Sequence, residues 1–328
     1  MNRVLITGGA GYIGSVLANA CIGRGYKVRV VDTLSFDYKT PLNNLSHPSY
    51  EFCRGDICDA SIYDRILEEV DFIVHTAAIV GEPASNKYAA LTRHVNVDAS
   101  IKLIEKAKSL KKKFIFFSTC SNYGIADGMA DENTPPTPLS LYSETKIDVE
   151  KYLLEKCNGL EWVICRLSTA YGASPRMRFD LTVNDFSIQA LTGKRLEIFL
   201  PYSYRPYAHV YDIAQVVCAL IENFNKVKNN VFNVGFEGEN YQKIQIADVI
   251  KKYIPDLEIK VVESNADMRD YRVDFTKLSK AVSIKKTYSI DDGVRQVITM
   301  FNEGLIADYK APEYYNTSPK LSEVNVVK

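Results

Sequence analysis

The first two-thirds of the chain alternates short β-branched runs with amphipathic stretches, and this alternation constrains the fold more than any other feature. Strands separated by helices pair in parallel, and the helices then cover both faces of the sheet. Strands are predicted over residues 3–7, 27–32, 50–53, 71–75, 113–118 and 162–166. Helices are predicted over 15–23, 95–110 and 141–156, the last with Ser140 as its N-cap. We therefore predict an α/β fold built on a Rossmann-type, doubly wound parallel sheet.

The rest of the chain is less regular. Loops and one helix (183–192) are predicted over 174–208, and a strand over 231–234 is expected to return to the sheet. Further helices are predicted over 211–224, 246–253 and 290–301. We predict a Rossmann domain of 1–173 plus about 210–236, a smaller, interleaved α+β lobe of about 174–209 plus 237–310, and an extended tail over 311–328.

The composition excludes several classes of function. Forty basic and forty acidic residues cancel, so nothing favours nucleic acid or an anionic membrane as a partner. The N-terminal apolar run is too short for a signal peptide, and no apolar stretch reaches the length of a membrane span. The seven cysteines are scattered and odd in number, which favours reduced thiols and a cytoplasmic protein. Without Cys-x-x-Cys or paired histidines, we expect no metal site.

A glycine-rich turn follows the first predicted strand directly. It reads Thr7-Gly8-Gly9-Ala10-Gly11-Tyr12-Ile13-Gly14, and a predicted helix comes next. Glycines at such a turn let a pyrophosphate approach the backbone, and the first N–H groups of the helix offer it hydrogen bonds. The turn therefore predicts a dinucleotide site. The residues expected to hold the phosphates are Gly8, Gly11, Tyr12, Ile13 and Gly14.

Asp32, at the end of the second predicted strand, favours NAD over NADP. A carboxylate at this position accepts hydrogen bonds from the adenosine ribose and repels a 2′-phosphate, and neither of the next two residues supplies a cation. Asp56 and Ile57 follow the third predicted strand and are placed at the adenine. Alternatively, Asp56 caps a helix that begins near Ala60.

Tyr142 and Lys146 lie four residues apart on the predicted helix 141–156, so their side chains share one face. A tyrosine hydroxyl, with a reference pKa of about 10, is a poor base at neutral pH. An ammonium group beside it favours the phenolate, and a cationic nicotinamide ring adds to that effect. Such a pair can move a proton on or off an alcohol while a hydride leaves or arrives.

Four further motifs occur in order around this pair and the glycine turn. They are His75-Thr76-Ala77-Ala78, Phe117-Ser118-Thr119-Cys120-Ser121-Asn122-Tyr123-Gly124, Arg166-Leu167-Ser168-Thr169-Ala170-Tyr171-Gly172 and Arg205-Pro206-Tyr207-Ala208-His209-Val210-Tyr211-Asp212. With these motifs the chain, from residue 1 to about 301, resembles the extended short-chain dehydrogenases/reductases of the nucleoside-diphosphate-sugar epimerase/dehydratase group. The resemblance implies an NAD-dependent enzyme whose smaller lobe binds a nucleoside-diphosphate sugar.

The resemblance implies roles for the matched residues. Tyr142 is the acid/base, Lys146 lowers its pKa and binds the nicotinamide ribose, and Thr119 hydrogen-bonds the reacting sugar hydroxyl. Cofactor contacts are also implied for Ala77, Ala78, Val80, Asn96, Ser168 and Thr169. Arg205 grips the diphosphate, a task that suits a planar cation with five donors. The other implied substrate contacts are Cys120, Ser121, Asn184 and either Arg269 or Arg272.

Three other basic positions have simpler interpretations. His75 is expected to be a packing group at the end of its strand rather than a catalyst. Arg176 and Arg178 are either cations of the pocket or solvated loop charges, and the sequence does not separate these alternatives.

Departures from the family pattern narrow the reaction. Dehydratases of the group carry an acidic pair directly after the catalytic Ser/Thr, where this chain has Cys120 and Ser121. The 3,5-epimerising members carry a cysteine two residues before the Tyr-Gly tyrosine, whereas Cys120 lies three before Tyr123, so we favour a packed thiol. The pattern favours a 4-epimerase with a transient 4-keto intermediate, and the alternative is a dehydrogenase or 4-ketoreductase with exchangeable NAD(H). A 4,6-dehydratase and a non-catalytic dinucleotide sensor are less favoured.

The resemblance also implies a homodimer, formed through the predicted helices that contain 97–110 and 146–157. Ile101, Ile104 and Leu153 are candidate apolar contacts across that interface. The same residues can instead face the sheet of their own chain, and the sequence leaves both arrangements open.

Overall fold

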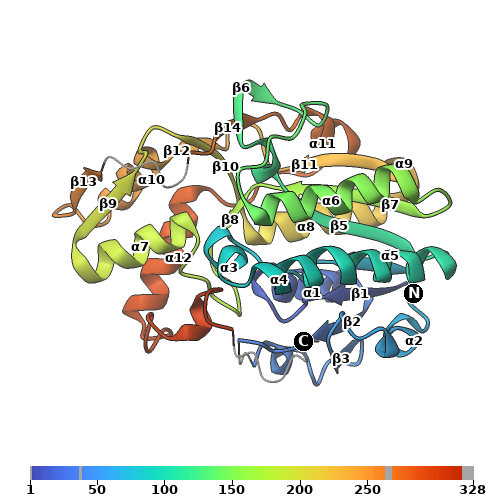
Figure 1. Ribbon diagram of the computed structural model, residues 1–328. Helices are drawn as coiled ribbons and strands as arrows, with labels where there is room; N and C mark the ends of the chain where they lie inside the picture. Colours follow the sequence, from blue (N-terminus) through green and yellow to red (C-terminus); the bar gives the residue numbers. More distant parts are fainter. Residues whose placement is uncertain (1, 37–38, 263–267, 320–328) are drawn as a thin grey trace.

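A seven-stranded parallel sheet forms the centre of the molecule, in a computed structural model that describes residues 2–36, 39–262 and 268–319 (Figure 1). The strand order is β11-β7-β5-β4-β1-β2-β3. The bounds are β1 Arg3–Thr7, β2 Lys27–Asp32, β3 Tyr50–Arg54, β4 Phe72–His75, β5 Lys113–Thr119, β7 Glu161–Leu167 and β11 Asn230–Val234. Each predicted strand of the sheet is present, including the one expected over 231–234, so the predicted doubly wound fold is confirmed.

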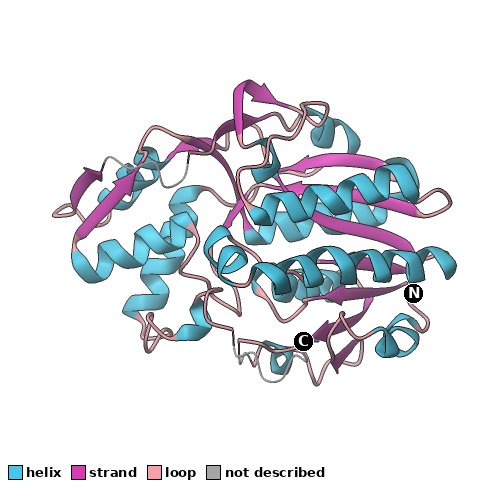
Figure 2. Ribbon diagram, viewed as in Figure 1, coloured by secondary structure: helices cyan, strands magenta, loops and turns pink. Residues whose placement is uncertain are grey.

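Helices cover both faces of this sheet (Figure 2). One face packs against α1 Tyr12–Gly23, α8 Val210–Glu222 and α9 Phe224–Val227. The other face packs against α2 Tyr63–Leu67, α5 Ser100–Ser109 and α6 Leu141–Lys156. Strand alternation explains the two cores, because Val4 and Ile6 enter the first cluster while Leu5 enters the second. The predicted cap of α6 is also present: Ser140 accepts from Ser143 N in a capping box.

The predicted helix over 95–110 has an irregular beginning. α3 Glu82–Lys87 and α4 Ala89–Arg93 lead into a π-helical turn, η3 His94–Ala99, and only then into α5. Single π-turns within helices often accompany functional sites, because they redirect side chains. Here the turn carries Asn96, whose amide reaches back to the loop after β4.

The second lobe contains more strands than the sequence indicates. The helix predicted over 183–192 is present as α7 Thr182–Gly193, but the expectation of loops alone over the rest of 174–208 is wrong, since β9 Arg195–Phe199 and β10 Tyr204–His209 follow it. The remaining short strands are β6 Ile125–Ala130, β8 Thr169–Tyr171, β12 Asn240–Gln242, β13 Glu258–Val262 and β14 Asp270–Val273. They pair as β12-β10-β8, β13-β9 and β14-β6. Each of these strands pairs with a strand that is distant in the sequence, so no local sequence pattern predicts the pairing.

A separate apolar core holds this lobe together. It joins α7 to α10 Lys243–Lys251 and α12 Ile290–Asn302 through side chains such as Val183, Ile250 and Val294. The short helix α11 Thr276–Ala281 instead packs near β11. The predicted boundaries between the two domains stay a prediction. Within the described residues, no helix is both long enough and apolar enough to cross a membrane.

The described part of the tail, residues 311–319, packs against the rest of the protein. After a short turn, η5 Pro312–Tyr314, the chain returns to the loop before α7. Phe179 N donates to Tyr314 O at 3.1 Å, and the two aromatic rings pack edge to face with centroids 5.3 Å apart. The predicted tail was 311–328, and its residues 320–328 lie outside the described part of the chain.

Candidate active site

A cavity of about 250 Å³ lies at the carboxyl ends of the central strands. This is the position at which open parallel sheets bind ligands. Its wall is made by the residues that follow β1, β2, β3 and β4, together with the ends of β5 and β7. Most of the predicted cofactor residues meet there: Gly8, Gly11, Tyr12, Ile13, Gly14, Asp32, Asp56, Ile57, Ala77, Ala78, Val80, Tyr142 and Lys146.

The glycine turn has the shape that a pyrophosphate requires. Gly8 has φ +70°, and a Cβ there would stand 2.8 Å from the Ala77 backbone. A Cβ on Gly14 would stand 2.4 Å from the Gly8 carbonyl oxygen, so α1 packs tightly on the turn. α1 begins at Tyr12, three residues before the predicted start, and no side chain of its N-cap Gly11 occupies the free N–H groups. Those groups are therefore available to phosphate oxygens.

Asp32 and Asp56, which are predicted to contact the adenosine, both line the cavity. The Asp32 carboxylate accepts from Ala10 N at 3.0 Å and from Leu34 N at 2.9 Å. Burial raises the pKa of Asp32, and these amides oppose the rise. The helix-cap alternative for Asp56 is wrong: Asp59 caps the turn at 60–62, and Asp56 instead accepts from Cys58 N within its own loop.

Tyr142 and Lys146 point into the same cavity from one face of α6. Lys146 Nζ lies 5.9 Å from the centroid of the Tyr142 ring and 4.9 Å from that of Phe116. Burial raises the pKa of Tyr142 to about 12, while the charge of Arg178 and a hydrogen bond with Thr119 act to lower it. Tyr142 is therefore a protonated phenol at neutral pH until more positive charge arrives.

Burial and a neighbouring carboxylate have opposite effects on the pKa of Lys146. Burial lowers the pKa of Lys146 to about 7, and the Glu150 carboxylate one helical turn away acts to raise it. The lysine is thus poised between its neutral and charged forms near neutral pH. The cations that act to lower the Tyr142 pKa are Arg178 and Arg269, both outside the motif pair.

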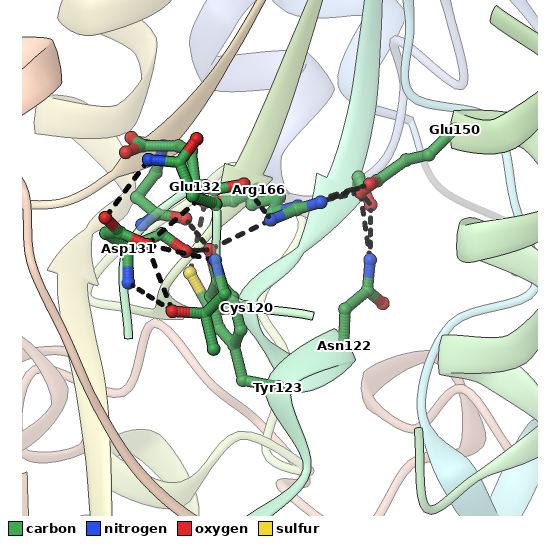
Figure 3. Close-up of polar contacts among 11 residues, drawn as sticks. Cys120, Asn122, Tyr123, Asp131, Glu132, Glu150 and Arg166 are labelled. Atoms are coloured by element: carbon green, nitrogen blue, oxygen red, sulfur yellow. Dashed lines mark hydrogen bonds and ion pairs between the residues drawn. The ribbon is translucent and has the colours of Figure 1, made fainter. Parts of the chain in front are cut away.

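A buried polar network around Glu150 joins α6 to β5 and β7 (Figure 3). Glu150 forms an ion pair with Arg166 at 2.7 Å, and both side chains are almost fully buried. Glu150 also accepts from Asn122 Nδ2 at 2.9 Å and from the Ser118 hydroxyl. Because Ser118 and Asn122 flank Thr119 in the chain, the network connects the helix of Tyr142 to the strand end of Thr119.

The two positions after Thr119 differ from each other in their surroundings. Cys120 is 1% exposed, its thiol donates to Arg166 O at 3.2 Å, and burial raises its pKa. It is a packed thiol, as expected. The Ser121 hydroxyl lies 3.4 Å from the Tyr271 hydroxyl and accepts from Arg269 at 3.3 Å.

Tyr271 organises the expected diphosphate grip. The Arg205 guanidinium lies 5.2 Å from the centroid of its ring, and Arg269 reaches the same place through Ser121. Burial raises the pKa of Tyr271, and both arginine charges oppose that rise. Arg272 is exposed and packs on Tyr204 instead, with 5.3 Å between its guanidinium and the ring centroid. The geometry therefore favours Arg269 over Arg272 as the second cation.

Arg176 and Arg178 are pocket cations rather than solvated loop charges. Both are buried and line the cavity. Arg176 lies 4.5 Å from the centroid of the Phe36 ring, and Arg178 forms a two-point ion pair with Asp180 at 2.8 and 3.1 Å. The sequence left this choice open because it does not reveal burial.

Several predicted residues do not line the cavity. Asn96 braces it instead: its amide exchanges hydrogen bonds with the Ile79 backbone at 2.8 and 3.0 Å and donates to Thr145 on α6 at 3.2 Å. Asn184 is fully buried and accepts from Gly172 N while donating to the Tyr12 hydroxyl. Ser168, Thr169 and Thr119 also lie outside the wall itself.

The prediction that His75 is a packing residue is confirmed. Its ring is buried between the hydroxyls of Thr7 at 2.7 Å and Ser100 at 2.9 Å. Burial lowers its pKa to about 3, so it is neutral in the folded protein.

Sequence reasoning missed three residues near the site: Glu150, Tyr271 and Asn316. Glu150 continues the four-residue spacing of Tyr142 and Lys146, a signal that was available. Tyr271 shows the alternation of a strand, with buried Tyr271 between exposed neighbours. Asn316 lines the cavity from the tail, and nothing local predicts its position.

The fold and the cavity are those of an NAD-dependent enzyme. The chain matches the NAD-dependent epimerase/dehydratase family over residues 4–235, and it belongs to that family. UDP-glucuronic acid decarboxylase 1 of Arabidopsis thaliana is 28% identical over 93% of this chain and 71% of its own length.

Solved structures agree with this assignment. UDP-glucose 4-epimerase of Thermotoga maritima, with UDP-glucose, has a TM-score of 0.81 at 28% identity and covers 92% of this chain and 99% of its own. UDP-glucuronic acid 4-epimerase of Bacillus cereus, in complex with UDP-glucuronic acid and NAD, has a TM-score of 0.81 at 26% identity with the same coverage. The chain is therefore an enzyme of the extended short-chain dehydrogenase/reductase group, and NAD is its cofactor.

Proposed function

We propose that this chain is a nucleoside-diphosphate-sugar 4-epimerase that works through a transient 4-keto sugar and keeps its NAD. The observation that carries this proposal is the pair of residues after Thr119. Cys120 is a buried, protonated thiol and Ser121 is neutral, so neither position supplies the acid or base that water elimination requires. Tyr142 then remains as the proton-moving group, which suits a redox step at one carbon.

The residues present have clear tasks in such a reaction. NAD, when bound, accepts a hydride from the sugar and returns it. Thr119 holds the reacting hydroxyl beside Tyr142, which takes its proton during oxidation and gives it back during reduction. Arg178 and Arg269 favour the phenolate by their charge. Arg205 and Arg269, near Tyr271, would hold the diphosphate while the ketosugar rotates to present its other face.

A nucleotide hexuronate is a second candidate substrate. Arg178 lines the cavity, and its charge is the strongest influence that lowers the pKa of Tyr142, so a cation acts on the proposed acid/base. A carboxylate on the sugar would pair with it. Two of the similar proteins act on or bind UDP-glucuronic acid by their names, which supports including that substrate class.

To test this proposal, the purified chain is incubated with a panel of nucleotide-linked neutral hexoses and nucleotide-linked hexuronates, and the products are separated. Product without net NADH supports the epimerase. Net NADH supports the exchangeable dehydrogenase or ketoreductase, and release of carbon dioxide identifies decarboxylation. A dehydrated 4-keto-6-deoxy product would contradict the proposal, because it needs the elimination that Cys120 and Ser121 do not support.

Tyr142→Phe tests the assigned acid/base within the same assay. We expect turnover to fall by roughly 10²–10⁴, because a general acid/base is removed while the ring stays. Tyr152→Phe is the matched control: it lies on the same helix and its hydroxyl contacts surface Glu105 at 2.9 Å. Unchanged turnover in Tyr142→Phe would remove Tyr142 from the mechanism.

The homodimer and the cytoplasmic location stay predictions. Of the three proposed interface residues, Ile104 and Leu153 are buried in the core of their own chain, and Ile101 is half-buried. Leu154 on α6 is 52% exposed and is a better candidate for a contact between two copies. Light scattering of the purified chain decides whether two copies associate.

A further inference from the structure

The described tail crosses the cofactor cavity and contacts the wall that belongs to the second lobe. Asn316 N donates to the Asp180 carboxylate at 3.1 Å. Asp180 also holds Arg178 by a two-point ion pair, and Arg178 lines the cavity. Together with the contact between Phe179 and Tyr314, this fixes the tail along the loop that precedes α7.

The same segment contacts the opposite wall, after β4. Asn316 Nδ2 donates to Val80 O at 3.2 Å. The Thr317 carbonyl oxygen accepts from Lys87 Nζ at 2.9 Å and from the Tyr88 hydroxyl at 3.3 Å. Residues 312–319, which we call the C-terminal strap, therefore bridge the two walls of the cavity (red in Figure 1).

Arg176 extends the strap toward the adenosine end. Its guanidinium donates to the Glu313 carbonyl oxygen at 3.3 Å and stacks on the ring of Phe36. Arg176 and Phe36 both line the cavity, and the charge of Arg176 reaches Asp32. The strap is thus connected to both the adenosine side and the Tyr142 side of the site.

One polar atom of the Asn316 side chain has no hydrogen-bond partner among the described residues. Its side chain is 8% exposed and lines the cavity, and its Nδ2 is occupied by Val80 O. Its Oδ1 is buried and has no hydrogen-bond partner among the described residues. A buried acceptor without a partner is costly, so on a residue that lines a cavity such an atom indicates a donor on a bound ligand.

We propose that the C-terminal strap is part of the NAD site, that Asn316 Oδ1 accepts a hydrogen bond from a ribose hydroxyl or amide of the dinucleotide, and that the strap retains bound NAD. The idea deepens the proposed epimerase, because a hydride that returns to the same sugar requires retained NAD. The role of the strap can be tested by NAD binding alone, without any sugar substrate.

NAD binding to the full chain, stripped of nucleotide, provides the first test. Asn316→Ala should raise the Kd for NAD by roughly tenfold and raise the dissociation rate in parallel, because one hydrogen bond and the strap anchor are both lost. Ser318→Ala, an exposed strap residue, is the matched control and should stay within about twofold of the wild-type Kd. Equal Kd values for the wild type and Asn316→Ala overturn the proposal.

Amide hydrogen exchange in the wild-type protein provides the second test and needs no variant. NAD should slow exchange at the Asn316 amide, and across 312–319, by roughly fivefold or more, because a retained ligand holds the strap closed. Exchange that NAD leaves unchanged across the strap overturns the proposal, even where Asn316→Ala fails to fold. That result would assign the Asn316 oxygen to an ordered water.

The outcomes separate this proposal from the function above. Weakened NAD binding in Asn316→Ala together with no epimerised product in the sugar panel supports the strap and rejects the epimerase. Epimerised product together with NAD binding that ignores Asn316 supports the epimerase and rejects the strap.

Discussion

Two arginine–carboxylate pairs act on the Tyr142/Lys146 pair by their charges, and they differ in what surrounds them. The inner pair, Arg166–Glu150, has side chains only 6% and 3% exposed and joins β7 to α6 (Figure 3). The outer pair, Arg178–Asp180, has side chains 9% and 23% exposed and faces the cavity. Protein atoms shield the inner pair from solvent. In the outer pair, Arg178 lines the cavity and Asp180 contacts the strap.

This difference assigns the two pairs different tasks. Glu150 is saturated by Arg166, Ser118 and Asn122, so it fixes the end of β5 against α6 and with it the position of Thr119 relative to Tyr142. Asp180 accepts from Arg178 and from the backbone of Asn316, so it couples the cavity wall to the strap. The inner pair sets geometry, and the outer pair can respond to a ligand.

The largest effect is expected from breaking the inner pair. Glu150→Ala leaves Arg166 buried without its carboxylate, which costs about 3–5 kcal/mol of unfolding free energy. Chemical denaturation that compares midpoints at an unchanged slope measures it. Glu144→Ala on the same helix is the control, because its contact with Arg93 is solvent-exposed and is worth at most about 1 kcal/mol. Equal losses in the two variants would show that the inner pair is not a structural centre.

The difference between local sequence patterns and long-range contacts explains which features the sequence predicts. The sheet, the glycine turn, Asp32 and the Tyr142/Lys146 pair follow from signals within a few residues, since a strand, a turn and a helix in series each have a local pattern. Asn316 joins Asp180 across 136 residues, and β14 pairs with β6 although the two strands lie far apart in the sequence. No propensity records such long-range contacts, so the strap and the small sheets had to come from the structure.

A second prediction concerns pH and the inner region, where His75 is buried beside Lys146. Burial lowers the pKa of His75 to about 3, while the unfolded chain titrates near 6.5. Between these values the unfolded state binds the proton and the folded state does not, so stability falls as pH drops below about 6.5. The loss is up to about 1.4 kcal/mol per pH unit from this residue.

The destabilisation caused by His75→Gln should therefore shrink as pH falls from 7 toward 4, because the wild type loses stability that the variant does not. Denaturation curves at each pH measure the difference between the two proteins. His94→Gln, at an exposed histidine, is the control and should change little at any pH. A difference that stays constant with pH would mean that His75 becomes protonated in the folded state.

The smallest stability effect is expected from the outer pair, although its chemical effect is more informative. Burial raises the pKa of Asp180, but the charge and hydrogen bond of Arg178 outweigh it and hold the pKa below its usual value. Asp180 thus stabilises the fold above about pH 4, and this contribution is lost at lower pH. Asp180→Asn should cost about 1 kcal/mol at neutral pH, since Arg178 keeps a neutral acceptor.

The charge of Arg178 is then no longer balanced, and it acts more strongly on Tyr142. We expect the pKa of Tyr142 to fall, so the limb of the pH–rate profile on which the rate rises with pH should move to lower pH in Asp180→Asn, because oxidation of the sugar needs the Tyr142 phenolate. Asp185→Asn, the next carboxylate in the chain and one that pairs with Gln189 rather than an arginine, is the control and should leave that limb in place. A loss of stability as large as that of Glu150→Ala, without a displaced pH profile, would make the outer pair a second structural centre and end the distinction between them.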